Sequence, residues 1–415
     1  MYYLIFHNQD KEISIIPIRM KKLIAYFDYI PDIFLLIVAF FLPTFPAVSQ
    51  VAILLFLIFW ITKGQYKYLY KIKEHVFALG SIAVFALYFL SGLYSDNLTF
   101  WGSNLEAKLP LLILPILLLS RENYDQKVVN STLWAFGLGC LSLIIYLHYE
   151  HISDPEFTFS RTMAIKTIAN SIYFAMYLSF VLLIGFVLNF KKIIQFNFKS
   201  FLLLAGLCWF HYAIYALASR MAILGTIGVE LMAVFVWKII LDRKIIQAGV
   251  MMFLIILVNF FSLNFAQKAT KKRIKKLRKQ GDVRELIWKG SWMQIAKSPI
   301  IGYGAGDTQD MLIEAYKTLD YNHGVKKKQN CHNQYLQILM TAGIIGLLVF
   351  LAWLLLSFRS AWLAQNYLFC IFVAIFALNI LTESMLERQQ GTYFVAFFGS
   401  LLLWKNEERT RKNQS

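Results

Sequence analysis

Residues 330–356 read NCHNQYLQILMTAGIIGLLVFLAWLLL. From Gln334 onward the segment carries no charged side chain. At about 1.5 Å per helical residue it is long enough to cross about 30 Å of hydrocarbon, so it predicts a transmembrane helix. Four polar residues precede or begin this helix, where it would leave the membrane: Asn330, His332, Asn333 and Gln334. The stretch therefore indicates a membrane protein with a polar, histidine-containing group at a membrane surface.

Similar apolar blocks recur along the whole chain. Hydrophobic residues make up 58% of the 415 residues, charged residues make up 16%, and the mean hydropathy is +0.56. Soluble domains are typically about 45–50% apolar and about 25% charged. We therefore expect an all-α polytopic membrane protein with about 12 transmembrane helices. The expected spans are residues 30–46, 47–62, 75–93, 108–120, 128–148, 170–190, 200–218, 221–241, 245–265, 333–356, 362–381 and 391–404.

The distribution of lysine and arginine orients these spans. With the N-terminus in the cytoplasm, the short inside segments hold 20 of these residues and the short outside loops hold 5, as the positive-inside rule requires. The chain then divides into residues 1–265 with about nine spans, a large periplasmic loop at 266–332, and residues 333–415 with about three spans and a cytoplasmic tail. The net charge of +17 reflects this topology, and no nucleic-acid partner is expected.

Residues 267–280, QKATKKRIKKLRKQ, oppose that orientation because they place eight basic residues in the outside loop. The positive-inside rule weakens for loops beyond about 60 residues, so the orientation stands. As a helix, the run has one cationic face, which suits either membrane lipid head-groups or plain solvation. Met20 begins a stretch like a signal peptide and is an alternative start of the protein. A second apolar block follows at once, so we expect an uncleaved first span.

Arg220 stands in the middle of one apolar run, residues 201–241, which is long enough for two spans. It would therefore lie at the outer tip of a tight helical hairpin. A guanidinium at this rim offers a planar fork of donors that matches phosphate oxygens. The alternative is an arginine that only snorkels to the interface. Arg161, Lys108 and Arg388 lie in other outside loops, where cations are scarce, and are further candidates for binding an anionic substrate.

A glycine-rich turn follows a short helical pattern in the large loop. Residues 282–312 read DVRELIWKGSWMQIAKSPIIGYGAGDTQDML, and the apolar helical pattern ends at Ser298–Pro299. Gly302, Gly304 and Gly306 then form a G-x-G-x-G pattern. Without a preceding parallel strand or a P-loop lysine, this pattern is weak evidence for phosphate binding. The simpler interpretation is a turn that brings backbone close to the membrane surface.

Four motifs in this order resemble those of the O-antigen ligase/polymerase superfamily. They are Ala-Ser-Arg at residues 218–220, Arg-x₃-Trp at 284–288, Ser-Pro-Ile-Ile-Gly-Tyr-Gly-Ala-Gly at 298–306, and His-Asn-Gln-Tyr-Leu-Gln at 332–337. The last motif runs into a Gly-Ile-Ile-Gly-Leu helix. Members of this superfamily are bacterial integral-membrane glycosyltransferases. The resemblance therefore implies a GT-C-like fold in a bacterial inner membrane, with the active site on the periplasmic side. It covers about residues 200–356 by motif.

The resemblance implies transfer of a glycan from undecaprenyl pyrophosphate without a metal or another cofactor. By motif, His332 and Arg220 would be catalytic: His332 would act on the acceptor hydroxyl, and Arg220 would engage the pyrophosphate with Arg161 nearby. General chemistry agrees, because fixed cations stabilise a departing diphosphate and histidine exchanges protons near neutral pH. No carboxylate pair suggests a divalent ion outside. The expected substrate-binding residues are Arg161, Arg284, Asn330, Asn333, Gln334, Lys108, Arg388, Gly302, Gly304 and Gly306.

Several alternatives remain at this point. In a ligase the acceptor is a lipid A–core sugar, whereas in a polymerase it is a second lipid-linked glycan. The basic run 267–280 suits a phosphorylated core and favours a ligase. Protein O-glycosylation is a third option. His332 could also be only a hydrogen-bonded residue at the interface. Cys331 could form a Cys–His nucleophile, which glycosyl transfer does not need. The four cysteines show no disulfide framework.

A transporter or a flippase for lipid-linked glycans is the alternative from a different class. His211 and Glu230 lie at about the same expected depth in neighbouring spans. Ionisable residues inside a membrane often belong to transport pathways. A His–Glu pair that only joins two helices is the interpretation we favour. Discontinuous helices and inverted repeats would support transport, and the sequence shows neither.

Overall fold

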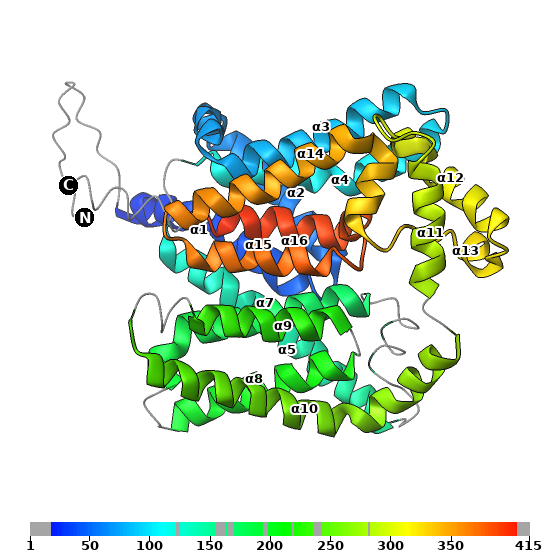
Figure 1. The fold of residues 1–415 in the computed structure, drawn as a ribbon. Coiled ribbons are helices and arrows are strands. Elements are labelled where there is room, and N and C mark those ends of the chain that lie inside the picture. The colour runs from blue at the N-terminus through cyan, green and yellow to red at the C-terminus, as the bar shows by residue number, and fades with distance from the viewer. Residues whose placement is uncertain are drawn as a thin grey trace, which may run out of the picture.

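The chain folds into a bundle of helices that lie roughly side by side, as the computed structural model in Figure 1 shows. The structure describes residues 18–121, 125–153, 170–193, 198–217, 220–235, 242–280 and 283–404, together with Phe159 and Met163. These residues form helices and turns and no strand. The expectation of an all-α polytopic membrane protein is confirmed.

The helices follow the apolar blocks of the sequence. In chain order they are α1 (Ile18–Phe41), α2 (Pro46–Thr62), η1 (Gln65–Glu74), α3 (Val76–Ser91), η2 (Gly92–Tyr94), α4 (Leu98–Leu119), α5 (Gln126–Ser153), α7 (Ser171–Ile193), α8 (Phe198–Ala216), α9 (Arg220–Val234), α10 (Ile245–Gln280), α11 (Val283–Ile295), α12 (Gly304–Thr318), α13 (Asn322–Lys327), α14 (Gln334–Leu363), α15 (Tyr367–Asn379), η4 (Met385–Glu387) and α16 (Gln389–Leu401). Each of the expected spans overlaps one of these helices.

Five helices in the described part of the chain are long and apolar enough to cross a membrane. They are Val76–Tyr94, Leu98–Leu119, Gln126–Ser153, Ile245–Ser262 and Gln334–Leu363. The chain bends by 105° between α2 and η1, and the two helices would form a sixth, bent span if they cross the membrane as one unit. Other apolar helices, such as Ser171–Gly185 and Tyr367–Asn379, are shorter. The expected number of about 12 spans therefore stays a prediction, as does the periplasmic side of the large loop.

The start of α4 differs from the expectation. The helix begins at Leu98, whereas the sequence suggested a start near residue 108. Lys108 therefore lies inside a helix, and its expected place in an outside loop is wrong. The helix also contains Pro115, which lacks the N–H group that would otherwise donate a hydrogen bond to Leu111 O. The Ser81 hydroxyl of α3 donates to Leu111 O instead, over 2.7 Å, so the carbonyl stays satisfied inside the bundle.

Helices α11–α13, residues 283–327, form a small helical unit that we call the cap. It stands at one end of the bundle in Figure 1. Its own apolar cluster includes Ile287, Leu312 and Tyr316 and continues onto Leu336 and Met340 of α14. The sequence had suggested a short helical pattern followed by a glycine-rich turn in this part of the loop 266–332. α10 also differs from the expectation, because it continues as one helix through the basic run to Gln280. The side chains of residues 267–280 lie outside the described ones.

α14 is broken near its first third, and the cap fills the break. Ala342 and Gly343 have non-helical backbone angles, with φ of −133° and +60°. Ile344 N donates to Pro299 O over 2.9 Å, and Tyr303 N donates to Met340 O over 2.8 Å. Residues 299–303 thus supply partners for backbone groups that the break leaves free, as a membrane interior requires. The sequence had shown no discontinuous helix, and this one is a correction.

Candidate active site

His332 lies in the short loop between the cap and α14, directly before the N-cap of that helix. Its backbone has a φ of +46°, and its N–H donates to Asn330 Oδ1 over 3.0 Å. The N-cap residue is Asn333, whose side-chain oxygen accepts from Leu336 N over 3.1 Å. Asn330 and Asn333 therefore shape the loop that presents His332. Their expected contact with sugar hydroxyls stays a prediction.

A buried carboxylate holds the imidazole of His332. Nδ1 lies 3.1 Å from Oε2 of Glu383, which follows α15 in the chain. The Glu383 side chain is 3% exposed, whereas that of His332 is 28% exposed. The neighbouring Ser384 hydroxyl accepts from Asn333 N over 3.2 Å and joins the two loops a second time. A carboxylate accepts hydrogen bonds, so this arrangement favours the proton on Nδ1 and leaves Nε2 as an acceptor.

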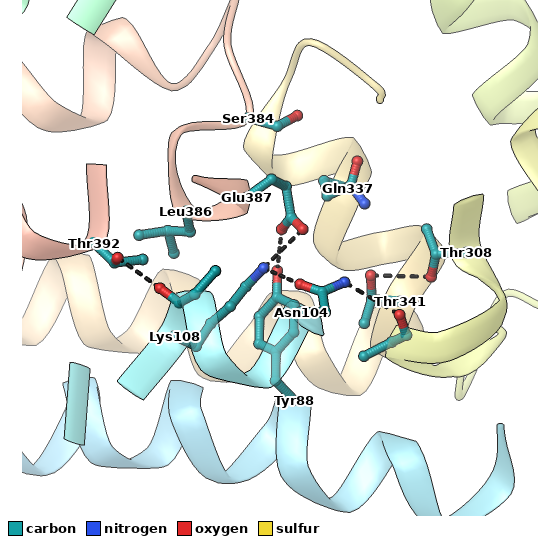
Figure 2. A network of polar contacts seen from close by, with 12 residues as sticks. Tyr88, Asn104, Lys108, Thr308, Gln337, Thr341, Ser384, Leu386, Glu387 and Thr392 are labelled. Carbon is teal, nitrogen blue, oxygen red and sulfur yellow. Dashed lines mark hydrogen bonds and ion pairs between the residues drawn. The ribbon is translucent and has the colours of Figure 1, made fainter. Parts of the chain in front are cut away.

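An ion pair between Lys108 and Glu387 lies in the interior of the bundle, as Figure 2 shows. Lys108 Nζ is 2.7 Å from Glu387 Oε2, and it also bonds to Asn104 Oδ1 of the same helix. Tyr88 donates its hydroxyl to Glu387 Oε1 over 2.8 Å, and the Lys108 ammonium lies 4.4 Å from the centre of the Tyr88 ring. The Lys108 side chain is 0% exposed and that of Glu387 is 10% exposed. These contacts tie α3, α4 and η4 together.

Gln334 belongs to this interior group. Its side chain is buried, its Oε1 accepts from Leu386 N over 2.8 Å, and its Nε2 donates to Tyr88 over 3.3 Å. Gln334 N also donates to Ile380 O over 2.9 Å. The residue therefore joins the start of α14 to the segment between α15 and α16. Its expected contact with substrate stays a prediction that this burial does not favour.

Arg388 and Arg284 occupy different surroundings. Arg388 is exposed and directly follows Glu387; its backbone carbonyl accepts from Gly391 N and Thr392 N, and its guanidinium forms no hydrogen bond or ion pair with another described residue. It thus shares the segment Glu383–Arg388 with the carboxylate that holds His332. Arg284 is half-buried in the first turn of α11, within the cap. Arg388 is therefore linked to the His332 loop through this segment, whereas Arg284 lies in the cap.

Arg220 begins α9, and its side chain lies outside the described residues, as does the whole of Arg161. The backbone still gives the direction of α9. Val234 at its end packs with Ala248 near the start of α10, and α10 leads toward the cap, so α9 starts at the cap end. Gly225 of α9 also lies beside Asn379, the last residue of α15. The start of α9 therefore faces the end of the bundle that carries His332.

The three glycines of the turn pack against neighbouring backbone and hydroxyl groups. A Cβ on Gly302, which has a φ of +68°, would lie 2.6 Å from Met340 O. The first free N–H groups of α12 are already used, because Gly306 N donates to Ser95 Oγ over 3.1 Å and its neighbour Ala305 N donates to Ser91 Oγ. A Cβ on Gly304 would also meet Ser95. The geometry favours the packing interpretation, and substrate contact by Gly302, Gly304 and Gly306 stays a prediction.

Cys331 is buried beneath the loop, with its sulfur 3.8 Å from that of Met340. Burial raises the pKa of its thiol to about 12. Since only the thiolate is a strong nucleophile, this environment does not support a Cys–His nucleophile. Cys140, Cys208, Cys331 and Cys370 are all free in the structure.

Acidic, cysteine and histidine side chains do not gather into a metal site among the described residues. No group of three of them could hold an ion there. The independence from metal that the sequence suggested stays a prediction, because the test is the reaction itself. Arg388, an exposed cation in the segment that holds His332, stays a candidate for binding an anionic group.

His211 and Glu230 form the pair that the sequence suggested. His211 Nε2 of α8 lies 2.7 Å from Glu230 Oε1 of α9, and both side chains are buried. Asn259 of α10 donates to the other oxygen of Glu230 over 3.4 Å and accepts from Tyr215 over 3.0 Å. The pair thus joins three helices, which supports the structural interpretation over a transport pathway.

The sequence interpretation missed both carboxylates of the site. Glu383 and Glu387 lie in TESMLERQ, a short segment between two apolar blocks. The topology argument counted only lysine and arginine there and so ignored them. A carboxylate between two spans is costly to bury unless it has a partner, and that cost was the available signal. Tyr88 and Asn104 carried no comparable signal, because Tyr88 donates to Glu387 and Asn104 donates to Ala305 O, both of which are far away in the sequence.

Comparison with known proteins bears on the middle of the chain. Residues 202–351 match the family model described as O-antigen ligase. The matched stretch includes the start of α9 with Arg220, the cap, the glycine turn and His332. Lys108 and the segment Glu383–Arg388 lie outside it. A search among curated proteins finds no match.

Proposed function

We propose that the chain transfers a glycan from undecaprenyl pyrophosphate to an acceptor hydroxyl at the cap end of the bundle, because residues 202–351 match the family model described as O-antigen ligase. The membrane would be a bacterial inner membrane, with both termini in the cytoplasm and the cap in the periplasm. The observation that carries the proposal is the bond between His332 and Glu383. It presents a partly exposed imidazole backed by a buried carboxylate, and the segment of that carboxylate also carries the exposed Arg388.

The geometry supports a direct displacement. The acceptor oxygen forms a bond to the anomeric carbon of the sugar, and the bond from that carbon to the diphosphate oxygen breaks. His332 Nε2 takes the proton of the acceptor hydroxyl, while Glu383 stabilises the imidazolium that results. The diphosphate leaves with the bonding electron pair and its added negative charge. Arg388 and Arg220 are the cations that we assign to this charge, since guanidinium groups bind phosphate oxygens in pairs.

A lipid A–core acceptor, and hence a ligase, is the form of the reaction that we favour. Lys326, Lys327 and Lys328 are exposed at the end of α13 and precede the loop of Asn330 and His332 by only a few residues. Three adjacent cations beside the site suit a phosphorylated acceptor. A polymerase of the same superfamily, with a second lipid-linked glycan as acceptor, is the alternative. Protein O-glycosylation would need a peptide hydroxyl in the same place.

The decisive experiment is a transfer assay with purified protein. It uses an undecaprenyl-pyrophosphate-linked glycan, with either a lipid A–core or a second lipid-linked glycan as acceptor, in the presence and absence of EDTA. We expect product in both EDTA conditions. His332→Ala and Arg220→Ala should each abolish transfer at normal protein levels, because each removes one of the assigned catalytic groups.

Three outcomes would contradict the proposal. Transfer that persists in either alanine variant would remove that residue from the site. If His211→Ala and Glu230→Ala abolish activity at normal levels while the His332 and Arg220 variants remain active, the transporter or flippase interpretation is favoured. Loss of product in EDTA would contradict the absence of a metal requirement. The acceptor that is consumed distinguishes a ligase from a polymerase.

A further inference from the structure

Lys108 has a location that its expected role does not explain. It lies in the interior of α4 with its side chain 0% exposed, and its ammonium contacts Glu387, Asn104 and the face of the Tyr88 ring. A lysine in this position has its charge balanced by Glu387 and its remaining directions taken up by Asn104 and Tyr88. A phosphate could reach the ammonium only if the bundle opened. The group that Lys108 binds is therefore part of the protein and not part of a substrate.

That protein group is a short segment with two active-site residues. Glu387 ends η4, four residues after Glu383 and one residue before Arg388. The segment is fixed to the interior of the bundle by the bonds of Lys108 and Tyr88 to Glu387 and by Gln334, whose side-chain oxygen accepts from Leu386 N. Displacing Glu387 would therefore move two residues at once: Glu383, which holds His332, and the exposed Arg388.

We propose that Lys108 is a positioning residue for the proposed transfer reaction. By neutralising and anchoring Glu387, it fixes the segment Glu383–Arg388 so that Glu383 meets His332 Nδ1 and Arg388 faces the substrate. This inference rests on the proposed function for its effect on activity. The anchoring itself is a property of the fold and can be measured separately.

The charges of the pair make the inference testable. Removing the ammonium alone leaves the Glu387 carboxylate buried without a counter-charge, which a low-dielectric interior strongly disfavours. Removing both charges avoids that penalty. In Lys108→Met with Glu387→Gln, the new amide oxygen can still accept from Tyr88, and the methionine keeps much of the lysine stem's volume. A positioning lysine can therefore be replaced when its partner is replaced too, whereas a lysine that binds substrate cannot.

The experiment compares kcat and KM of four proteins: the wild type, Lys108→Met, Glu387→Gln and the double variant. We expect Lys108→Met to lower kcat about 10²-fold with little change in KM, because a displacement of about 1 Å can cost that much. The double variant should recover at least about tenfold of the loss. The matched control is the pair Lys297–Glu314 of the cap, which is exposed. The same two substitutions there should leave kcat unchanged.

Either of two results would overturn the inference. A double variant as inactive as Lys108→Met would show that the ammonium itself is needed. A wild-type kcat in Lys108→Met would show that the anchoring is unnecessary. A second measurement does not depend on activity: a cysteine placed at Leu381, next to the segment, is labelled by a maleimide and read by peptide mass spectrometry. Labelling should be faster in Lys108→Met than in the wild type or the double variant.

The labelling measurement also separates the two proposals. Equal labelling rates in all four proteins would contradict the anchoring whatever the reaction is. Faster labelling in Lys108→Met, combined with no transfer by the wild type on any tested acceptor, would overturn the proposed function and leave the anchoring in place.

Discussion

Glu383→Gln is the substitution that tests the assigned chemistry of His332 most sharply. The amide has nearly the same shape as the carboxylate, so the buried site, 3% exposed, should stay filled and the protein should fold. The change removes the negative charge that stabilises the imidazolium. If the amide nitrogen faces Nδ1, it also donates where the carboxylate accepted, which moves the imidazole proton to Nε2 and blocks proton uptake there.

The separation of the two groups sets the size of the effect. Unit charges 3.1 Å apart interact by about 1.3 kcal/mol in a water-like medium and about 5 kcal/mol at an effective dielectric constant near 20. At 1.36 kcal/mol per tenfold, this range corresponds to a loss in kcat between about tenfold and several thousandfold. His332 is partly exposed, so we expect about 10²-fold, within the usual range for general base catalysis.

The assay is the purified transfer reaction at saturating acceptor, with kcat compared at equal protein. Glu314→Gln is the matched control, because it makes the same change in an exposed carboxylate of the cap and should have no effect. Glu383→Asp, which withdraws the carboxylate by about one carbon–carbon bond, should fall between the wild type and Glu383→Gln. A Glu383→Gln protein with kcat within threefold of the wild type would refute the assigned role of this pair.

Three further predictions concern the surroundings of the site. His211→Leu should lower the free energy of unfolding by about 3–5 kcal/mol, because it leaves Glu230 buried without its partner. Unfolding in detergent measures this loss. A transfer assay on the folded fraction should show that activity is kept. Gly302→Ala should reduce both stability and kcat, because its Cβ would lie 2.6 Å from a backbone oxygen of α14; unchanged values in both would contradict the close packing of the glycine turn against α14. Cys331, whose thiol pKa is raised to about 12, should react with iodoacetamide at pH 8.5 about 10³-fold more slowly than in the unfolded chain. The reaction rate should rise as the pH approaches that pKa. Fast labelling of the native thiol would contradict its buried environment.

The positions of the helices could be predicted from the sequence because apolar blocks determine them directly. The start of α4 could not. Lys108 marked a loop in the sequence, since an unpaired ammonium is costly inside a membrane. Its partner Glu387 is separated from it by 279 residues, and no local pattern reports such a pairing. The break in α14 was hidden for a similar reason. Gly343 alone does not interrupt a helix, and the carbonyl groups that stabilise the break come from residues 299–300 of the cap.

The candidate site was predictable only in part. His332 stood out because a histidine with amide neighbours at the head of an apolar segment is unusual, and Arg220 stood out because it interrupts a long apolar run. Glu383 did not stand out, since the pairing depends on how the segment between α15 and α16 folds back onto the start of α14. Gln334 resembled a substrate ligand in the sequence. Its burial follows from the same fold-back, through the bond to Leu386 N.

The most direct test of the account is a structure of the protein with a non-hydrolysable undecaprenyl-pyrophosphate glycan. We expect the diphosphate at the cap end of the bundle, within hydrogen-bonding distance of the Arg388 or Arg220 guanidinium, and the anomeric carbon of the sugar on the side that His332 Nε2 faces. A diphosphate bound at the opposite end of the bundle, or beside His211 and Glu230, would contradict the account.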